Sequence, residues 1–316
     1  ICYAKKLMQI LITGSAGFIG FHLAKKILDS NLKVVGIDNL NPYYDVNLKK
    51  NRIKILKKNK DFKFYKLDLN QKQKISNIIK KYKIKYIVHL AAQAGVRYSI
   101  TNPEAYFKSN LEGFFNILQL SKENKIKHLI FASTSSVYGN NKKFPLKENM
   151  RTDNPLSFYA ATKKSNEVMA YSYANIFKIP STALRFFTVY GPFGRPDMAL
   201  FKFAKNIIMN KKIPLFNSGN HTRDFTYITD IVEGIFLLIK KPPKSKIPYR
   251  CFNIGNGKPE KLKKFLNLIE NNLNIKSKIY NMPLQTGDVK KTHSDISFLK
   301  KITNYKPKTR IDDGIK

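Results

Sequence analysis

Apolar residues recur along the first 185 positions with two alternating spacings. Short apolar runs bounded by polar or glycine positions predict buried strands at 8–12, 33–37, 62–67, 86–90, 128–132 and 181–186. Between them, apolar side chains three and four residues apart predict helices at 18–28, 72–82, 103–124 and 157–177. Strands that alternate with helices indicate an α/β fold, in which a Rossmann-type doubly wound parallel sheet carries helices on both faces.

From about residue 187 the pattern is less regular. The run Gly191-Pro192-Phe193-Gly194 predicts a loop. Beyond it we expect helices at 199–209, 228–240 and 261–272, and strands at 213–216, 251–254 and 277–281. We therefore predict a first domain over residues 1–186 and a smaller α+β lobe over 187–316, with segments near 226–257 returning to the first sheet. The first residue is Ile1 and Lys316 follows soon after a glycine, so we also expect truncation at one or both ends, with a final helix missing.

Composition narrows the possible classes of protein. The chain has 316 residues, of which 43% are hydrophobic, enough for a large core. No run approaches the ~20 apolar residues that span a bilayer. The apolar run at 7–12 leads directly into a glycine motif, which is not the pattern of a secretory signal. Cys2 and Cys251 are too few and too far apart for a disulfide framework, so we predict a cytoplasmic protein.

The strong positive charge is a second constraint. The formal net charge is +37, from 58 Lys and Arg against 21 Asp and Glu. Lysines are spread over the whole chain, whereas nucleic-acid readers cluster their charge and use the forked guanidinium. We therefore expect no nucleic-acid partner, no membrane partner and no metal site. Because Lys is so common, a retained Arg suggests a position that needs the planar fork, and Arg97, Arg185, Arg195 and Arg223 fall in the segments discussed below.

A glycine-rich loop predicts a nucleotide site. Gly14, Gly17 and Gly20 follow the first predicted strand and open the first predicted helix. They allow a tight turn, a close approach of the backbone to a pyrophosphate, and close packing of helix on sheet. Asp38 ends the second strand, where a carboxylate binds both ribose hydroxyls and repels a 2′-phosphate, so NAD is favoured over NADP.

The neighbours of these residues complete the predicted cofactor pocket. Asp68 follows the third strand, where its carboxylate either reaches the adenine or caps the next helix. The other predicted cofactor residues are Phe18, Ile19, Asn39, Leu69, Ala91 and Ala92.

Tyr159 and Lys163 supply the candidate chemistry. They are four residues apart in a predicted helix, so both side chains lie on one face. An ammonium near the phenol favours the phenolate, which can take a proton from a hydroxyl while a nicotinamide takes the hydride. The hydroxyl cluster 133–136 ends a predicted central strand, where ligands of open α/β sheets bind. A Ser/Thr-rich loop without function is the alternative for any one of these hydroxyls.

Together these motifs resemble the extended short-chain dehydrogenase/reductases of the NAD-dependent epimerase/dehydratase family. The resemblance covers nearly the whole chain and rests on the glycine loop 13–20, the turn 91–93, the STSSVYG segment 133–139 and the YxxxK motif 159–163. Three further segments, 38–45, 94–99 and 195–199, are similar to UDP-glucuronate 4-epimerases in particular.

The resemblance implies a role for each residue of the site. Tyr159 would be the base toward the sugar 4-hydroxyl, Lys163 would bind the nicotinamide ribose and tune Tyr159, and Thr134 would hydrogen-bond the reacting oxygen. Among substrate-binding residues, Ser135 and Ser136 would lie near the sugar carboxylate, Thr188 and Arg195 would complete the carboxylate pocket, Arg223 would bind the UDP diphosphate, and Arg97 joins this group. A surface salt bridge is the alternative for Arg195, and an ion pair with Asp224 is the alternative for Arg223.

The resemblance also implies the reaction. UDP-glucuronate and UDP-galacturonate would interconvert through a 4-keto intermediate on tightly held NAD, in a homodimer formed by the helices at 103–124 and 157–177. Related 4,6-dehydratases place Asp-Glu after the catalytic Thr, where this chain has Ser135 and Ser136. Epimerisation of UDP-glucose or UDP-N-acetylglucosamine and decarboxylation of UDP-glucuronate remain open. A non-catalytic NAD-binding protein would not need Thr134, Tyr159 and Lys163 together.

Overall fold

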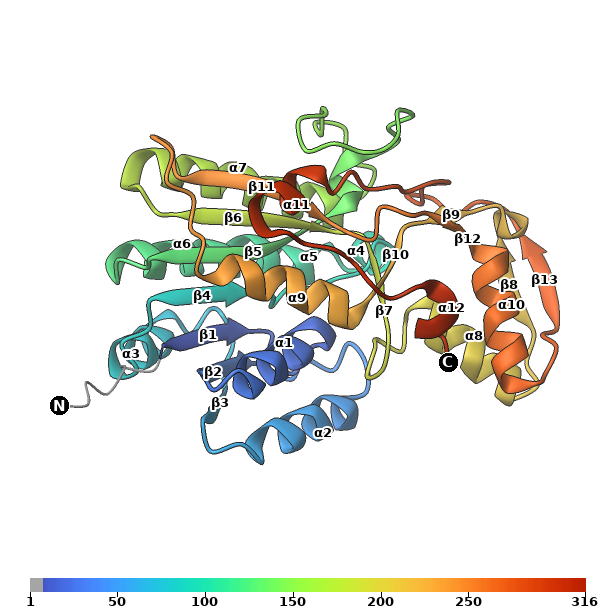
Figure 1. Ribbon diagram of the computed structural model, residues 1–316, viewed down its shortest axis with the longest axis horizontal. Helices are drawn as coiled ribbons and strands as arrows, with labels where there is room; N and C mark the ends of the chain where they lie inside the picture. The colour runs from blue at the N-terminus through green and yellow to red at the C-terminus, as the bar shows by residue number, and fades with distance from the viewer. Residues whose placement is uncertain (1–7) are drawn as a thin grey trace.

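The protein is built on one central parallel sheet, as the computed structural model of residues 8–316 shows (Figure 1). Cys2 and Leu7 lie outside these described residues. Seven strands pair in the order β11-β6-β5-β4-β1-β2-β3. Their bounds are Gln9–Thr13 (β1), Lys33–Asp38 (β2), Phe62–Lys66 (β3), Tyr86–His89 (β4), His128–Thr134 (β5), Ser181–Phe186 (β6) and Tyr249–Ile254 (β11). The expected Rossmann-type sheet is confirmed, and its strand order reverses beside β1, the place where such sheets bind nucleotides.

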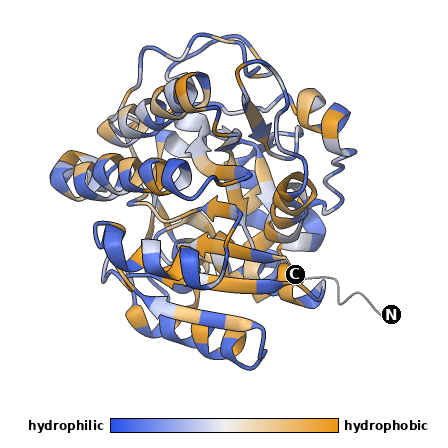
Figure 2. Cartoon of the chain, turned by 90° about the vertical axis from the view of Figure 1, so that its left-hand side faces the viewer, coloured by the Kyte–Doolittle hydropathy of each residue, from blue (hydrophilic) through white to orange (hydrophobic). Residues whose placement is uncertain are grey.

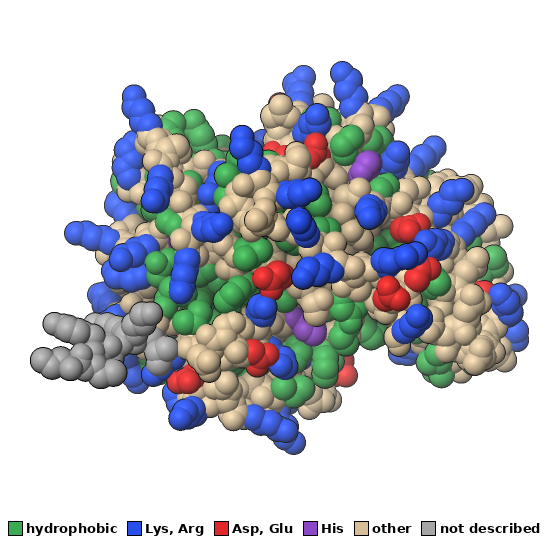
Figure 3. Space-filling view, in the orientation of Figure 1, with side chains coloured by type: hydrophobic (Ala, Val, Ile, Leu, Met, Phe, Trp, Pro, Cys, Tyr) green, Lys and Arg blue, Asp and Glu red, His purple; other side chains and the backbone are tan. Residues whose placement is uncertain are grey.

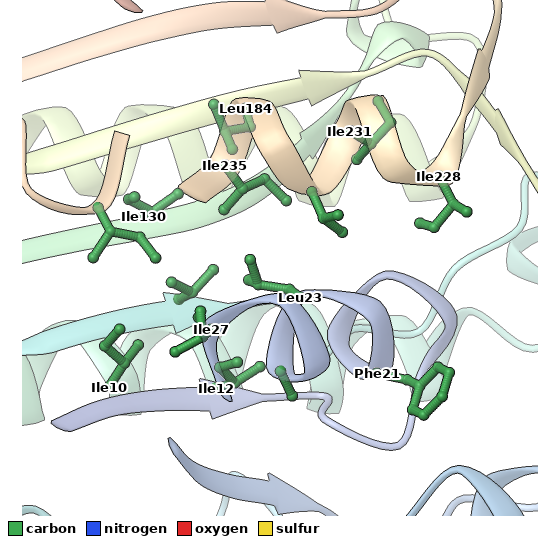
Figure 4. Packing of buried hydrophobic residues seen from close by; sticks show 14 of the residues in the cluster. Ile10, Ile12, Phe21, Leu23, Ile27, Ile130, Leu184, Ile228, Ile231 and Ile235 are labelled. Carbon is green, nitrogen blue, oxygen red and sulfur yellow. The ribbon is translucent and has the colours of Figure 1, made fainter. Parts of the chain in front are cut away.

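Helices cover both faces of this sheet, because successive strand residues point to opposite sides. Ile10 and Ile12 face one core while Leu11 faces the other. Figure 4 shows the first core, where α1 (Phe18–Asp29) packs against α9 (Ile228–Ile239). The second core lies under α3 (Lys72–Lys81), α6 (Gly113–Glu123) and α7 (Phe158–Phe177). The chain coloured by hydropathy shows this layering as orange inner surfaces under bluer outer faces (Figure 2).

The sequence pattern failed to predict α2 (Val46–Lys57). This helix is rich in Lys and Asn; Ile53 and Leu56 are buried in the core, and Ile55 packs against it partly buried. Asp45 nevertheless caps its start by accepting a hydrogen bond from the Asn47 amide (2.8 Å). Two short helices near the end of the chain, α11 (Ser297–Thr303) and α12 (Ile311–Gly314), were also not predicted.

The helix expected at 103–124 is divided into pieces. After the short α4 (Tyr98–Thr101), α5 (Pro103–Tyr106) leads into a π-helical turn at Phe107–Glu112 and then into α6. The wider turn contains Asn110, whose side chain accepts from the Gln93 amide (2.8 Å) and donates to the Gln93 carbonyl (3.0 Å). The π turn therefore fixes the loop after β4, consistent with the frequent occurrence of such turns near functional sites.

A second group of elements lies beyond the carboxyl ends of the sheet and has its own core around Phe203, Leu215 and Phe265. It contains α8 (Ala199–Ile208), α10 (Leu262–Leu273) and the parallel pair β8 (Ile213–Phe216) and β13 (Ile279–Met282). Two further short pairs complete the strands: β7 (Thr188–Tyr190) with β10 (Phe225–Tyr227), and β9 (Thr222–Arg223) with β12 (Glu260–Lys261). Between these segments the chain returns to the main sheet, where α9 packs on α1 and β11 pairs with β6.

The surface carries the positive charge broadly. On the face shown in Figure 3, Lys and Arg side chains are scattered over both groups of elements, and acidic side chains are few. From residue 8 onward, none of the helices is both long and apolar enough to cross a membrane.

Candidate active site

One cavity of about 1300 Å³ opens between the carboxyl ends of the sheet and the second group of elements. Every site residue predicted from the sequence lines it. On the sheet side these are Gly14, Gly17, Phe18, Ile19, Gly20, Asp38, Asn39, Asp68, Leu69, Ala91, Ala92, Thr134, Ser135, Ser136, Tyr159 and Lys163, and on the other side Arg97, Thr188, Arg195 and Arg223.

The glycine loop forms a cradle with no room for side chains. Gly14 has φ +74°, and a Cβ there would lie 2.6 Å from the Ala91 amide nitrogen. A Cβ on Gly20 would overlap the Gly14 carbonyl. No acidic residue lies in the first turn of α1, so the positive end of this helix is free to face an anion.

Asp38 stands at the end of β2 beside this cradle. Its carboxylate accepts hydrogen bonds from the amides of Ala16 (3.1 Å) and Leu40 (2.8 Å). Burial raises its pKa, while these amides and the charges of Lys49 and Arg52 oppose that rise. A carboxylate held on the wall next to a phosphate cradle fits the adenosine half of NAD.

Asp68 completes this side of the pocket. It accepts a hydrogen bond from the Asn39 side chain (2.8 Å) and another from the Asn70 amide (3.0 Å). The helix that follows begins at Lys72 with Gln71 as its cap residue, so Asp68 does not cap it. The first alternative, in which Asp68 faces the nucleotide, is the one that agrees with its place on the cavity wall.

The catalytic candidates meet at the centre of the cavity. Ser157 caps α7 by accepting from the Ala160 amide (3.2 Å), which places Tyr159 in the first turn beside Thr134. Thr134 ends β5, and its hydroxyl accepts from the Ser136 amide (3.1 Å) and donates to the Ser136 hydroxyl (3.1 Å). Lys163 is one turn further along α7 and only 2% exposed.

The electrostatics differ from the expected picture. Lys163 donates to the Ala132 carbonyl (3.0 Å), not to Tyr159, and burial lowers the pKa of its amine to about 7. Burial also raises the pKa of Tyr159, against the lowering effects of the Thr134 hydroxyl and the Arg195 charge. The expected lowering of the Tyr159 pKa by Lys163 is therefore absent in the protein alone. Loss of water around the phenol outweighs both the Thr134 hydrogen bond and the Arg195 charge.

A buried ion pair between β6 and α7 lies next to β5, the strand that ends at Thr134. Arg185 on β6 pairs with Glu167 on α7 (2.8 Å), and Ser133 donates to the same carboxylate (2.6 Å). Both charged side chains are at most 5% exposed. Arg185 does not line the cavity, so its fork serves the fold, unlike the other three arginines singled out from the sequence.

Arg195 presents part of its guanidinium to the cavity. Its Nε and one terminal nitrogen bind both oxygens of Asp197 (3.0 and 2.5 Å), and Tyr43 donates to the same carboxylate (3.2 Å). Burial alone would raise the pKa of Asp197, but the hydrogen bonds and charge of Arg195 lower it. The salt bridge named as the alternative for Arg195 is thus present, yet it is partly buried and lies on the cavity wall, not on the outer surface.

Arg223 lies at the far end of the cavity and is paired as well. Its partner is Asp288 (2.9 Å) and not the adjacent Asp224, which is fully buried and accepts from the Ser294 amide (2.9 Å). His221 lies 3.5 Å from Asp288. Arg97, which directly precedes α4, stacks over the Phe216 ring of β8 at 4.9 Å, so Arg97, Arg195 and Arg223 all line the same cavity.

Several wall residues were not assigned site roles from the sequence. Tyr43 and Asp197 fall inside segments that carried the family resemblance, which was the available signal. Lys49, His221 and Asp288 have no motif around them and reach the cavity only through the fold.

Comparison with known proteins agrees with this geometry. Residues 10–255 match the family described as NAD dependent epimerase/dehydratase. The probable UDP-glucuronate 4-epimerase of Rhizobium meliloti (strain 1021) is 45% identical over 98% of this chain and 95% of its own length. The UDP-glucuronate 4-epimerase of Thermodesulfobacterium geofontis (strain OPF15) is 42% identical over 97% of this chain and 93% of its own.

A solved structure shares the whole fold. The UDP-glucuronic acid 4-epimerase of Bacillus cereus, crystallised with UDP-glucuronic acid and NAD, superimposes with a TM-score of 0.91 at 34% identity, over 98% of this chain and 96% of that one. The family match, the two relatives and this structure lead to one conclusion: the chain belongs to the NAD-dependent epimerase/dehydratase family.

Proposed function

We propose that this protein is an NAD-dependent UDP-sugar 4-epimerase that interconverts UDP-glucuronate and UDP-galacturonate through a 4-keto intermediate. The observation that carries the proposal is the cavity of about 1300 Å³. It brings the glycine cradle and Asp38 together with Thr134 and Tyr159, and places Arg195 opposite them. Relatives that bear this activity in their names match nearly the full chain.

The residues of the sheet side would hold NAD. The glycine cradle and the start of α1 would receive the pyrophosphate, Asp38 the adenosine ribose, and Lys163 the nicotinamide ribose. When bound, NAD supplies an acceptor and then a donor of hydride at the sugar C4.

Tyr159 would move the proton of the reacting hydroxyl. Its raised pKa means that the phenolate needs added positive charge near the ring. Arg195 already acts in this direction, and the ammonium form of Lys163 lies one turn away. Thr134 would hold the oxygen through which the proton passes, as a hydrogen-bonding partner that cannot itself ionise at neutral pH.

The second group of elements would hold the UDP-sugar. Arg223 would bind the diphosphate with Arg97 nearby, and Ser135, Ser136 and Thr188 would surround the sugar carboxylate. Because Asp197 occupies one edge of the Arg195 fork, only the remaining terminal nitrogen is left for that carboxylate. Closure of the two groups around the substrate would keep water from the keto intermediate.

The identity of the product tests the proposal. Purified protein is incubated with UDP-glucuronate, UDP-glucose or UDP-N-acetylglucosamine without added nucleotide, and products are separated by chromatography. We expect UDP-galacturonate from the first and little conversion of the others. Release of CO2 with a UDP-pentose would identify a decarboxylase, and faster conversion of UDP-glucose would identify a different epimerase.

We also propose that the protein is a cytoplasmic homodimer. Large apolar side chains are exposed on α7 and on the helical segment beside it: Phe107, Phe115, Val168, Tyr171, Ile176 and Phe177. Two such helices from each copy would form a four-helix contact that buries them. Sedimentation of the wild type should give twice the chain mass, and Val168→Glu with Ile176→Glu should give the single chain mass.

A further inference from the structure

Side chains from α1 and α2 bind the loop that carries Arg195. His22 on α1 donates through Nε2 to the Pro192 carbonyl (2.9 Å). Arg52 on α2 donates through one terminal nitrogen to the carbonyls of Phe193 (2.6 Å) and Gly194 (3.1 Å). Side chains of α1 and α2 therefore hold three successive carbonyls that directly precede Arg195.

Arg52 also holds the glycine loop. Its other terminal nitrogen donates to the Ala16 carbonyl (2.8 Å) and to the Tyr44 hydroxyl (2.8 Å). One guanidinium therefore joins the backbone of the nucleotide cradle to the backbone of the Arg195 loop. A lysine has a single nitrogen and lacks the planar fork needed to bind both loops in this way.

Burying the Arg52 side chain should cost free energy of folding. The side chain is 0% exposed, and among residues 8–316 its hydrogen bonds go only to uncharged oxygens. The charge of Arg52 acts on the nearby Asp38 carboxylate without a hydrogen bond to it, and a buried charge that no carboxylate binds directly is costly for folding. Stability alone is therefore a poor explanation for this residue at this position.

The conformation of Phe193 gives independent support. Its φ is +52°, in the left-handed region that non-glycine residues rarely adopt. Its ring packs against Phe21 at 5.1 Å and near His22 at 6.4 Å. The loop is thus turned sharply just before Arg195, and α1 holds the turn in place.

We propose that Arg52 and His22 are positioning residues, forming a clamp that fixes Arg195 relative to the nucleotide cradle and so sets the preference for a sugar that carries a carboxylate. Neither residue is among those that line the cavity proposed to hold that sugar. The inference rests on the proposed function, because Arg195 is the residue that would recognise the carboxylate.

The test uses Arg52→Lys, which keeps the charge but loses the fork, and His22→Phe, which keeps an aromatic ring but loses the donor. Arg250→Lys is the matched control, since Arg250 contacts Thr182 on the other edge of the sheet (3.2 Å) and does not line the cavity. Three readouts are taken on the full chain: amide hydrogen exchange of residues 191–198, bound NAD per chain, and KM and kcat for UDP-glucuronate and UDP-glucose.

We expect faster exchange at 191–198 in both variants and unchanged exchange in the control. The KM for UDP-glucuronate should rise on the order of tenfold in Arg52→Lys and less in His22→Phe, with the KM for UDP-glucose nearly unchanged in both and the NAD content nearly unchanged in His22→Phe. Unchanged exchange in both variants overturns the clamp. Equal losses on both sugars, or loss of NAD in His22→Phe, also overturn it, because the two residues would then serve the fold or the cofactor. If the wild type ignores UDP-glucuronate, the proposed function has failed, and the exchange data alone decide whether the clamp exists.

Discussion

Lys163 makes the stability of this protein depend on pH in a predictable direction. Burial lowers the pKa of its amine from 10.5 to about 7. The unfolded chain keeps the ordinary value, so between these two pKa values it binds more protons than the folded protein does. Stability should therefore rise with pH across this window, and the full cost of the buried ammonium should be present below about pH 7.

The size of the effect follows from the same two pKa values. At 1.36 kcal/mol for each tenfold change in proton affinity, the fall from 10.5 to about 7 corresponds to about 5 kcal/mol. Roughly 3 kcal/mol of this is recovered between about pH 6 and pH 9. For a chain of 316 residues, that corresponds to a rise in Tm of roughly 4–5 °C.

The measurement compares wild type with Lys163→Met, in nucleotide-free protein, by thermal unfolding at both pH values. Methionine has a similar length and no charge, and the Ala132 carbonyl that it leaves without a donor costs the same at each pH. His89, the neighbouring titratable group, has a pKa of about 3 through burial and the Lys163 charge, so it stays neutral throughout. Between about pH 6 and pH 9, the Tm of the wild type should rise by roughly 4–5 °C more than that of the variant. If the Tm difference between the two proteins were the same at both pH values, burial would not lower the pKa of Lys163, and the reasoning would be refuted.

Three further outcomes are expected. Tyr159→Phe should keep its fold and bound NAD but lose turnover by at least about a hundredfold, the usual worth of a positioned acid or base; a near wild-type rate would remove Tyr159 from the reaction. Gly20→Ala should lose bound NAD and about 1–3 kcal/mol of stability, because its Cβ would overlap the Gly14 carbonyl; nucleotide content after denaturation and Tm measure both. Glu167→Gln should cost about 3–5 kcal/mol in urea unfolding, because it leaves Arg185 buried without its charge partner; a loss below that of a surface pair would mean that water reaches the site.

The sequence predicted the elements whose apolar spacing is dense. The strand at 213–216 has the predicted bounds, and the helix at 157–177 begins one residue later than predicted, because Ser157 is its cap. The pattern failed for α2, in which polar Lys and Asn residues dominate and few side chains reach the core. It also failed for the π turn at Phe107–Glu112, because a widened helical turn changes the spacing by one residue without changing composition.

The site could be predicted wherever a motif marks a backbone requirement. The glycine cradle depends on the absence of Cβ atoms, and the YxxxK pair depends on the helical repeat, so both can be recognised from the sequence. Ion-pair partners are not visible in this way. Arg223 pairs with Asp288, 65 positions away, although Asp224 is its immediate neighbour, because the buried Asp224 carboxylate accepts hydrogen bonds from backbone amides, including that of Ser294.

Arg195 illustrates how the two kinds of information combine. The rarity of Arg in a lysine-rich chain predicts that the guanidinium fork of Arg195 binds a partner, but the sequence does not identify that partner. In the structure Asp197 takes one edge of the fork, while Arg52 and His22 hold the carbonyls just before it. The charge of Arg195 opposes the burial that raises the pKa of Tyr159. In the proposed clamp, the other terminal nitrogen of Arg195 keeps a fixed position relative to that phenol. A lysine at 195 would keep the charge but would lose the edge that binds Asp197, and with it the fixed position. In the proposed reaction the fork therefore matters because it binds the protein with one edge and offers a donor to the substrate at the other.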